Sequence, residues 1–97
     1  MTRNEIANVV KKTIIKHLQL NKHFFEQYEN GGEQLYLSAD LGADMLDKFE
    51  ILSKVESKCG ILVNDGEVIW QEDITIAQYI DAIFEETKKN IRKFRYE

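Results

Sequence analysis

Residues 40–55 read Asp-Leu-Gly-Ala-Asp-Met-Leu-Asp-Lys-Phe-Glu-Ile-Leu-Ser-Lys-Val, and this stretch decides the predicted fold. It has the pattern of a loop that passes directly into an amphipathic helix with Met45 exposed at its start. Gly42 allows a tight turn, and Asp44 suits an N-cap because its carboxylate can accept hydrogen bonds from the free amides of the first turn. Apolar residues then recur every three or four positions, which predicts one buried helical face. This predicted face comprises Leu46, Phe49, Leu52, Val55 and Cys59.

At these residues the sequence resembles the acyl carrier proteins. That family carries Asp-Leu-Gly-Ala-Asp-Ser-Leu-Asp at the start of its second helix, and residues 40–47 match it at every position except one. The mismatch falls on the family's serine, which receives 4′-phosphopantetheine through a phosphodiester. A thioether has no hydroxyl that could attack the pyrophosphate of coenzyme A, so Met45 cannot take this arm. We therefore expect no cofactor in this chain, and 4′-phosphopantetheine only if position 45 held a serine.

The resemblance also implies where partners bind. In the family, the second helix is the docking surface for synthases, transferases and the enzyme that attaches the arm, through acids at its start and along its exposed side. By this resemblance the expected partner-binding residues are Asp40, Asp44, Leu46, Asp47, Glu50 and Glu56. Three lysines interrupt the acids and leave residues 44–58 with a net charge of -1, which would weaken steering by a uniform acidic stripe.

The fold that the resemblance implies is all-α, an antiparallel four-helix bundle with a short third helix and a long first loop. Gly60 is the expected end of the second helix, over residues 45–58. Beyond it, residues 61–63 could form a strand that enters a turn, with residues 68–70 as its hairpin partner. A lone hairpin is marginal, so the helical patterns on either side favour a short helix over about residues 66–71.

Two longer helices are expected on either side of this region. Thr2 and Glu5 have the spacing of a capping box, and the apolar stripe of a first helix follows at Ile6, Val9, Val10, Ile14 and Leu18. Thr75 resembles the family's N-cap for the last helix. The apolar positions of that helix are Ile76, Tyr79, Ile80, Ile83, Phe84, Thr87, Ile91 and Phe94. In the long connection, residues 24–28 suggest a short helical turn and residues 35–37 an anchor that folds back over the core.

Length and composition indicate one small domain that spans residues 1–97. Hydrophobic residues make up 43% of the chain and charged residues 31%, as in a soluble globular protein. No apolar run approaches the ~20 residues of a membrane span, and the amino terminus lacks the apolar stretch of a secretory signal. Cys59 is the only cysteine, which excludes an intrachain disulfide and a thiolate metal site. We expect a cytoplasmic monomer.

The charges are segregated along the chain. Residues 1–22 and residues 88–97 each carry a net charge of +4, whereas residues 23–87 carry -12. Such a field would attract a basic partner surface and repel nucleic acid across most of the molecule, so we expect no nucleic-acid partner. A solvated acidic surface is the simplest explanation of the acidic middle, and docking to basic enzyme patches is the alternative.

The residue types do not indicate an enzyme. His17 and His23 have neither a nucleophile nor an acidic orienter at a recognisable spacing, and we interpret both as capping or surface residues. Asp40, Asp44 and Asp47 lack the alternating oxygen ligands and the glycine of a calcium loop, so we predict no metal site.

Three functions stay open at this point. The first is a carrier-like domain without a prosthetic group that docks to acyl-transfer or fatty-acid or polyketide-type biosynthetic enzymes, as a decoy, scaffold or specialised subunit. The second is a true acyl carrier protein whose attachment serine has been replaced by Met45. The third is a small helical adaptor or regulator unrelated to acyl transfer, which only the basic end of the last helix supports.

Overall fold

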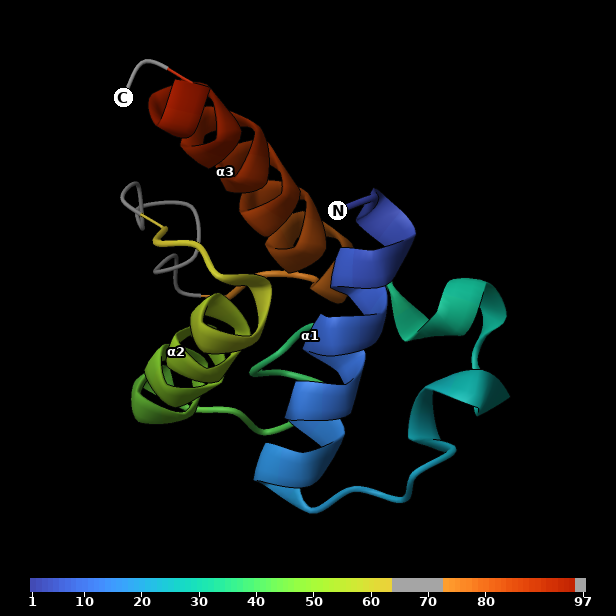
Figure 1. The fold of residues 1–97 in the computed structure, drawn as a ribbon. Helices are drawn as coiled ribbons and strands as arrows, with labels where there is room; N and C mark the ends of the chain where they lie inside the picture. Colours follow the sequence, from blue (N-terminus) through green and yellow to red (C-terminus); the bar gives the residue numbers. More distant parts are fainter. Residues whose placement is uncertain (64–72, 96–97) are drawn as a thin grey trace.

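The computed structural model describes residues 1–63 and 73–95, with the backbone alone for residues 90–95. Its elements, in chain order, are α1 (Arg3–Leu18), η1 (Phe24–Gln27), η2 (Glu29–Gly32), α2 (Met45–Cys59) and α3 (Ile76–Arg95), where η denotes a 3-10 turn. α1 packs against both α2 and α3, and the two η turns lie beside α1 (Figure 1). The described residues contain no β-strand, so the all-α prediction is confirmed for them. The predicted short third helix and the second strand of the alternative hairpin lie outside the described residues. Residues 61–63, the first strand of that hairpin, are described and form no strand.

α1 begins at the capping box that the sequence predicts. The Thr2 hydroxyl accepts a hydrogen bond from the Glu5 N–H at 3.2 Å, and the Glu5 carboxylate accepts one from the Thr2 N–H at 2.8 Å. These bonds satisfy two of the amides that a helix start leaves without a partner. The buried residues of α1 are Ile6, Ala7, Val10, Thr13 and Ile14. The predicted stripe is confirmed at its centre, whereas Val9 and Leu18 lie partly buried at the edge of the core.

α2 begins and ends at the predicted signals. Asp44 is the N-cap, and Asp47 completes a capping box: the Asp47 N–H donates to the Asp44 carboxylate at 2.8 Å, and the Asp44 N–H donates to the Asp47 carboxylate at 3.0 Å. Gly60 is the C-cap in the left-handed region, with a φ of 67°, a conformation that costs glycine little. The helix ends at Cys59, one residue beyond the predicted end at Lys58.

The predicted buried face of α2 is wrong at its first two members. Leu46 is 62% exposed and Phe49 56% exposed. The buried residues of α2 are Lys48, Ile51, Leu52 and Val55. The helix carries two overlapping stripes, and the one that starts at Leu46 and Phe49 continues into the polar residues Ser53 and Glu56. Burial of the other stripe hides more apolar surface, and the aliphatic stem of Lys48 can cover apolar neighbours.

The long connection folds back onto the start of α3, as the anchor predicted at residues 35–37 requires. The Leu37 N–H donates to the Ile74 carbonyl at 2.9 Å, and the Ile76 N–H donates to the Leu35 carbonyl, also at 2.9 Å. Leu37 and Ile74 are fully buried. The predicted turn at residues 24–28 is confirmed as η1, where Phe25 joins the core.

α3 begins at Ile76, directly after the predicted N-cap Thr75. The Thr75 hydroxyl accepts a hydrogen bond from the Gln78 N–H at 3.1 Å, and the Gln78 side chain accepts one from the Thr75 N–H at 2.9 Å. The fully buried residues of this helix are Ile76, Tyr79, Ile80 and Ile83. The predicted core positions Ile91 and Phe94 lie where only the backbone is described. Within residues 1–63 and 73–95, no helix combines the length and apolar character that a membrane crossing requires.

Candidate functional site at the start of the second helix

The first turns of α2 present apolar side chains to solvent. Met45, the first residue of the helix, is 54% exposed, and it adjoins the exposed Leu46 and Phe49. Phe49 is four residues from Met45 and three from Leu46, the spacings that bring side chains together on a helix surface. We call these three residues the α2 apolar patch. Single exposed apolar residues are ordinary, but a cluster of them is characteristic of a binding surface.

The loop that precedes α2 is held by hydrogen bonds of its own. The Asp40 carboxylate accepts one from the Tyr36 N–H at 2.7 Å, and the Ser38 hydroxyl donates to the Ala43 carbonyl at 2.8 Å. Asp40, a predicted partner-binding residue, is exposed but has one oxygen committed to the loop. These bonds fix the path of the chain into Asp44.

Asp73, just before α3, fastens the same loop. Its carboxylate accepts hydrogen bonds from the N–H groups of Ser38 at 3.0 Å, Ala39 at 3.1 Å and Ile74 at 2.9 Å. Burial raises the pKa of Asp73, but these hydrogen bonds and the positive charge of Lys48 outweigh it and leave the pKa below its usual value. This role of Asp73 was not predicted from the sequence, because no local spacing connects Asp73 with residues 38 and 39.

Two predicted docking acids, Asp47 and Glu50, lie against His17 at the end of α1. The His17 Nε2 atom is 3.0 Å from Asp47 Oδ1 and 3.3 Å from Glu50 Oε2, while its Nδ1 atom is 3.1 Å from the Lys54 amine. An ammonium group can only donate, so Nδ1 accepts in this arrangement and Nε2–H faces the carboxylates. Hydrogen bonds lower the pKa of Asp47, chiefly the one from the Asp44 N–H and in part that from His17.

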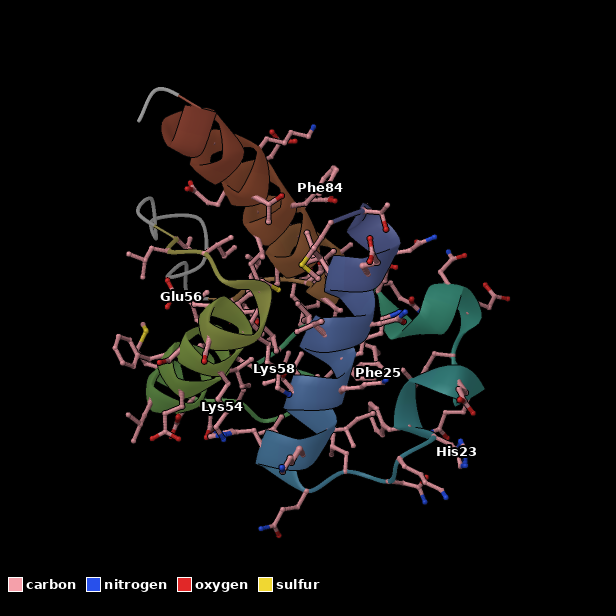
Figure 2. The ribbon with its side chains drawn as sticks, in the orientation of Figure 1. His23, Phe25, Lys54, Glu56, Lys58 and Phe84 are labelled. Atoms are coloured by element: carbon pink, nitrogen blue, oxygen red, sulfur yellow. The ribbon has the colours of Figure 1, made fainter. Side chains whose placement is uncertain are left out.

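These contacts correct the interpretation of His17 as a capping or surface residue. Its side chain is only 10% exposed and connects α1 to α2. His23 agrees with the prediction, because it is exposed and pairs with Glu26 at 2.8 Å within the same turn. Figure 2 shows Lys54 on the side of α2 that faces α1, consistent with its contact to His17.

Glu56, the last predicted docking acid, has a structural contact. Its carboxylate accepts a hydrogen bond from the Val63 N–H at 2.7 Å, and its side chain is partly buried. It thereby caps the turn that leaves α2 (Figure 2). Of the predicted acids, Asp40, Asp44, Asp47 and Glu56 have oxygens bonded to backbone amides. The α2 apolar patch is exposed beside them.

Neither a metal-ligand cluster nor an activated thiol is found in the part of the chain that the structure describes. In residues 1–63 and 73–89, no three His, Cys, Asp or Glu side chains are placed to hold a metal ion. Burial raises the pKa of the Cys59 thiol, which disfavours the reactive thiolate at neutral pH. Comparisons of the chain with protein-family models, with curated proteins and with solved structures give no match.

Proposed function

We propose that this chain is a monomeric, cytoplasmic acyl-carrier-protein-like domain with no catalytic activity of its own and no prosthetic group. In this proposal, the segment between α2 and α3 contributes the short third helix of a four-helix bundle. The start of α2 docks to acyl-transfer or fatty-acid or polyketide-type biosynthetic enzymes. The observation that carries the proposal is the placement of Met45. It is exposed at the first residue of α2 and lies within residues 40–47, which match the carrier motif in seven of eight positions.

The rigidity of this placement supports a role in docking. Position 45 follows the Asp44 capping box, and the preceding loop is bonded to Asp73 through Ser38 and Ala39. A partner would therefore meet a preformed surface, which reduces the ordering cost of binding. A carrier needs the same rigidity, because the residue at this position must enter the active site of the enzyme that modifies it.

The side chains around position 45 indicate how a partner would bind. The α2 apolar patch offers Met45, Leu46 and Phe49, whereas Asp47 and Glu50 are close to His17. Apolar contacts would supply most of the affinity, and the few acidic oxygens would orient the partner. Binding should consequently depend less on salt than binding through a continuous acidic stripe does.

The test uses Met45→Ser, with Met45→Ala as the matched control. Each protein is incubated with coenzyme A and a phosphopantetheinyl transferase, and its intact mass is measured. The wild type and Met45→Ala should keep their mass, while Met45→Ser should gain one phosphopantetheinyl group. A folded Met45→Ser protein that the transferase refuses would contradict the proposal, as would modification of the wild type.

A second candidate, a true carrier with a substituted serine, is favoured by the intact capped loop around position 45. The two candidates differ in what Met45 does for a partner. A domain specialised to work without the arm should bind its acyl-transfer enzyme more weakly after Met45→Ser, because a partner contact is lost. A true carrier should bind at least as well as before. Calorimetry with the unmodified proteins measures this difference.

A further inference from the structure

A hollow of about 250 Å³ lies between α1 and the η1 segment. Its wall includes the partly buried Ile15 from α1 and the buried Phe25 from η1, and Figure 2 shows Phe25 on the side of η1 next to α1. Gly31 closes one side with backbone alone. A side-chain carbon at Gly31 would lie 2.5 Å from the Lys11 amine, so the missing side chain leaves room for that amine at the wall.

Three lysines surround this hollow. Lys11, Lys12 and Lys22 contribute to its lining, against a single acid, Glu26, which leaves a net charge of +2. The Glu26 carboxylate is 2.8 Å from the His23 ring, and His23 is not a lining residue of the hollow. Lys11 is 3.8 Å from Glu33, whereas Lys12 and Lys22 form no ion pair within the described residues. Two ammonium groups are thus available to a ligand.

The apolar and cationic parts of the lining are adjacent. The Lys11 amine lies 5.9 Å from the centroid of the Phe25 ring, which places a positive charge directly beside the apolar wall. A ligand that fills the hollow would need an anionic group for the lysines and an apolar body for Ile15 and Phe25. The volume is below the roughly 300 Å³ at which pockets for drug-sized ligands begin, so the body must be short.

We propose that this hollow binds a small organic anion, a phosphate or carboxylate carried on a short apolar or aromatic body. The site does not depend on the function proposed for α2, because η1 and α2 lie on opposite sides of α1 (Figure 1). The same chemistry could be presented by a soluble metabolite or by a lipid headgroup. The experiment therefore separates these two sources.

The direct test is a titration of the ¹⁵N-labelled protein with phenyl phosphate, followed by amide chemical shifts. The amides of Lys12, Phe25 and Gly31 should shift together, and those of α2 should not. Inorganic phosphate lacks the apolar body and benzyl alcohol lacks the charge, so each should bind at least about threefold more weakly than phenyl phosphate. Equal affinity for inorganic phosphate, or shifts confined to other regions, would overturn the proposal.

Charge-matched variants locate the site. Lys12→Gln and Lys22→Gln should each weaken phenyl phosphate binding by about threefold, the scale of one solvent-exposed charge interaction. Lys16 lies on α1, as Lys12 does, but does not line the hollow. Lys16→Gln should therefore change the affinity less than about twofold. An equal effect of all three variants would show diffuse electrostatic attraction and overturn the proposal.

Sedimentation with phosphatidylglycerol vesicles provides the lipid arm. If the ligand is a soluble anion, Lys12→Gln should lower vesicle binding no more than Lys16→Gln does. Vesicle binding that requires Lys12 and Lys22, without any phenyl phosphate shift, would replace the proposed site with a membrane-facing surface.

Discussion

The Nε2 atom of His17 lies 3.0 Å from Oδ1 of Asp47, and this contact joins the last turn of α1 to the capping box of α2. Because Asp47 also bonds the Asp44 backbone, the end of one helix supports the start of the next. The helix that carries the candidate docking surface is therefore positioned from two directions, by His17 and by Asp73.

Removal of the His17 imidazole should destabilise the fold. His17→Ala removes a nearly buried side chain that contacts Asp47 and Lys54, and the expected loss is about 1–2 kcal/mol of unfolding free energy. Urea denaturation at pH 7 measures it. His23→Ala is the control, because His23 is exposed and its replacement should cost less than about 0.5 kcal/mol. Equal losses for the two variants would contradict the bridging role of His17.

Asp73 should give the protein a stability that depends on acid. Its pKa is lower in the folded state than in the unfolded state, so the carboxylate stabilises the fold above the unfolded value near 4 and loses this effect as the pH falls through the folded pKa. Asp73→Asn should cost about 1–3 kcal/mol at pH 7, and the difference from the wild type should shrink below about pH 4. Urea titrations at several pH values test this. Glu85→Gln, an exposed control, should show no comparable trend.

One buried and one exposed leucine of α2 provide a matched pair. Leu52 is 5% exposed and Leu46 62% exposed. Leu52→Ala should cost about 2–5 kcal/mol, whereas Leu46→Ala should cost less than about 1 kcal/mol. Under the proposed function, binding to an acyl-transfer enzyme should follow the reverse order, with Leu46→Ala the more damaging. If Leu46→Ala destabilised the fold as strongly as Leu52→Ala, the assignment of the buried face would be wrong.

Two glycines with positive φ should differ in their response to alanine. At Gly60 a side-chain carbon would meet nothing within 4 Å, so Gly60→Ala should cost only the conformational strain of about 1 kcal/mol. At Gly32 it would lie 2.8 Å from the Phe25 ring and 3.2 Å from Leu35. Gly32→Ala should therefore cost clearly more in thermal or urea unfolding. A similar loss of unfolding free energy in both variants would mean that η2 can shift to accommodate the added methyl group.

The helix boundaries could be predicted because their causes are local. Each capping residue bonds within a few residues of its own position. These residues are the pair Thr2 and Glu5, the N-caps Asp44 and Thr75, and the C-cap Gly60. Side-chain oxygens and amides three residues apart meet in almost any chain that turns into a helix there. The signals in the sequence were therefore sufficient.

The candidate site was predicted less completely, because its contacts are distant in sequence. The partners of Asp73 lie 34 and 35 residues earlier, and His17 and Asp47 are 30 residues apart. The buried face of α2 was misassigned at Leu46 and Phe49 because periodicity alone favours neither of two overlapping stripes. The choice is made by packing against α1 and α3, which the pattern of one helix does not contain.

The bonds from Asp73 to residues 38 and 39 set an order of events during synthesis on the ribosome. A nascent chain that ends before residue 73 already contains the residues of α1 and α2, but the carboxylate that fastens the approach to Met45 has not yet been made. The loop that leads into the candidate docking surface is fastened only after residue 73 has emerged. A truncated product of interrupted translation would keep residues 40–47 in its sequence but would lack the bonds that fasten the loop before α2.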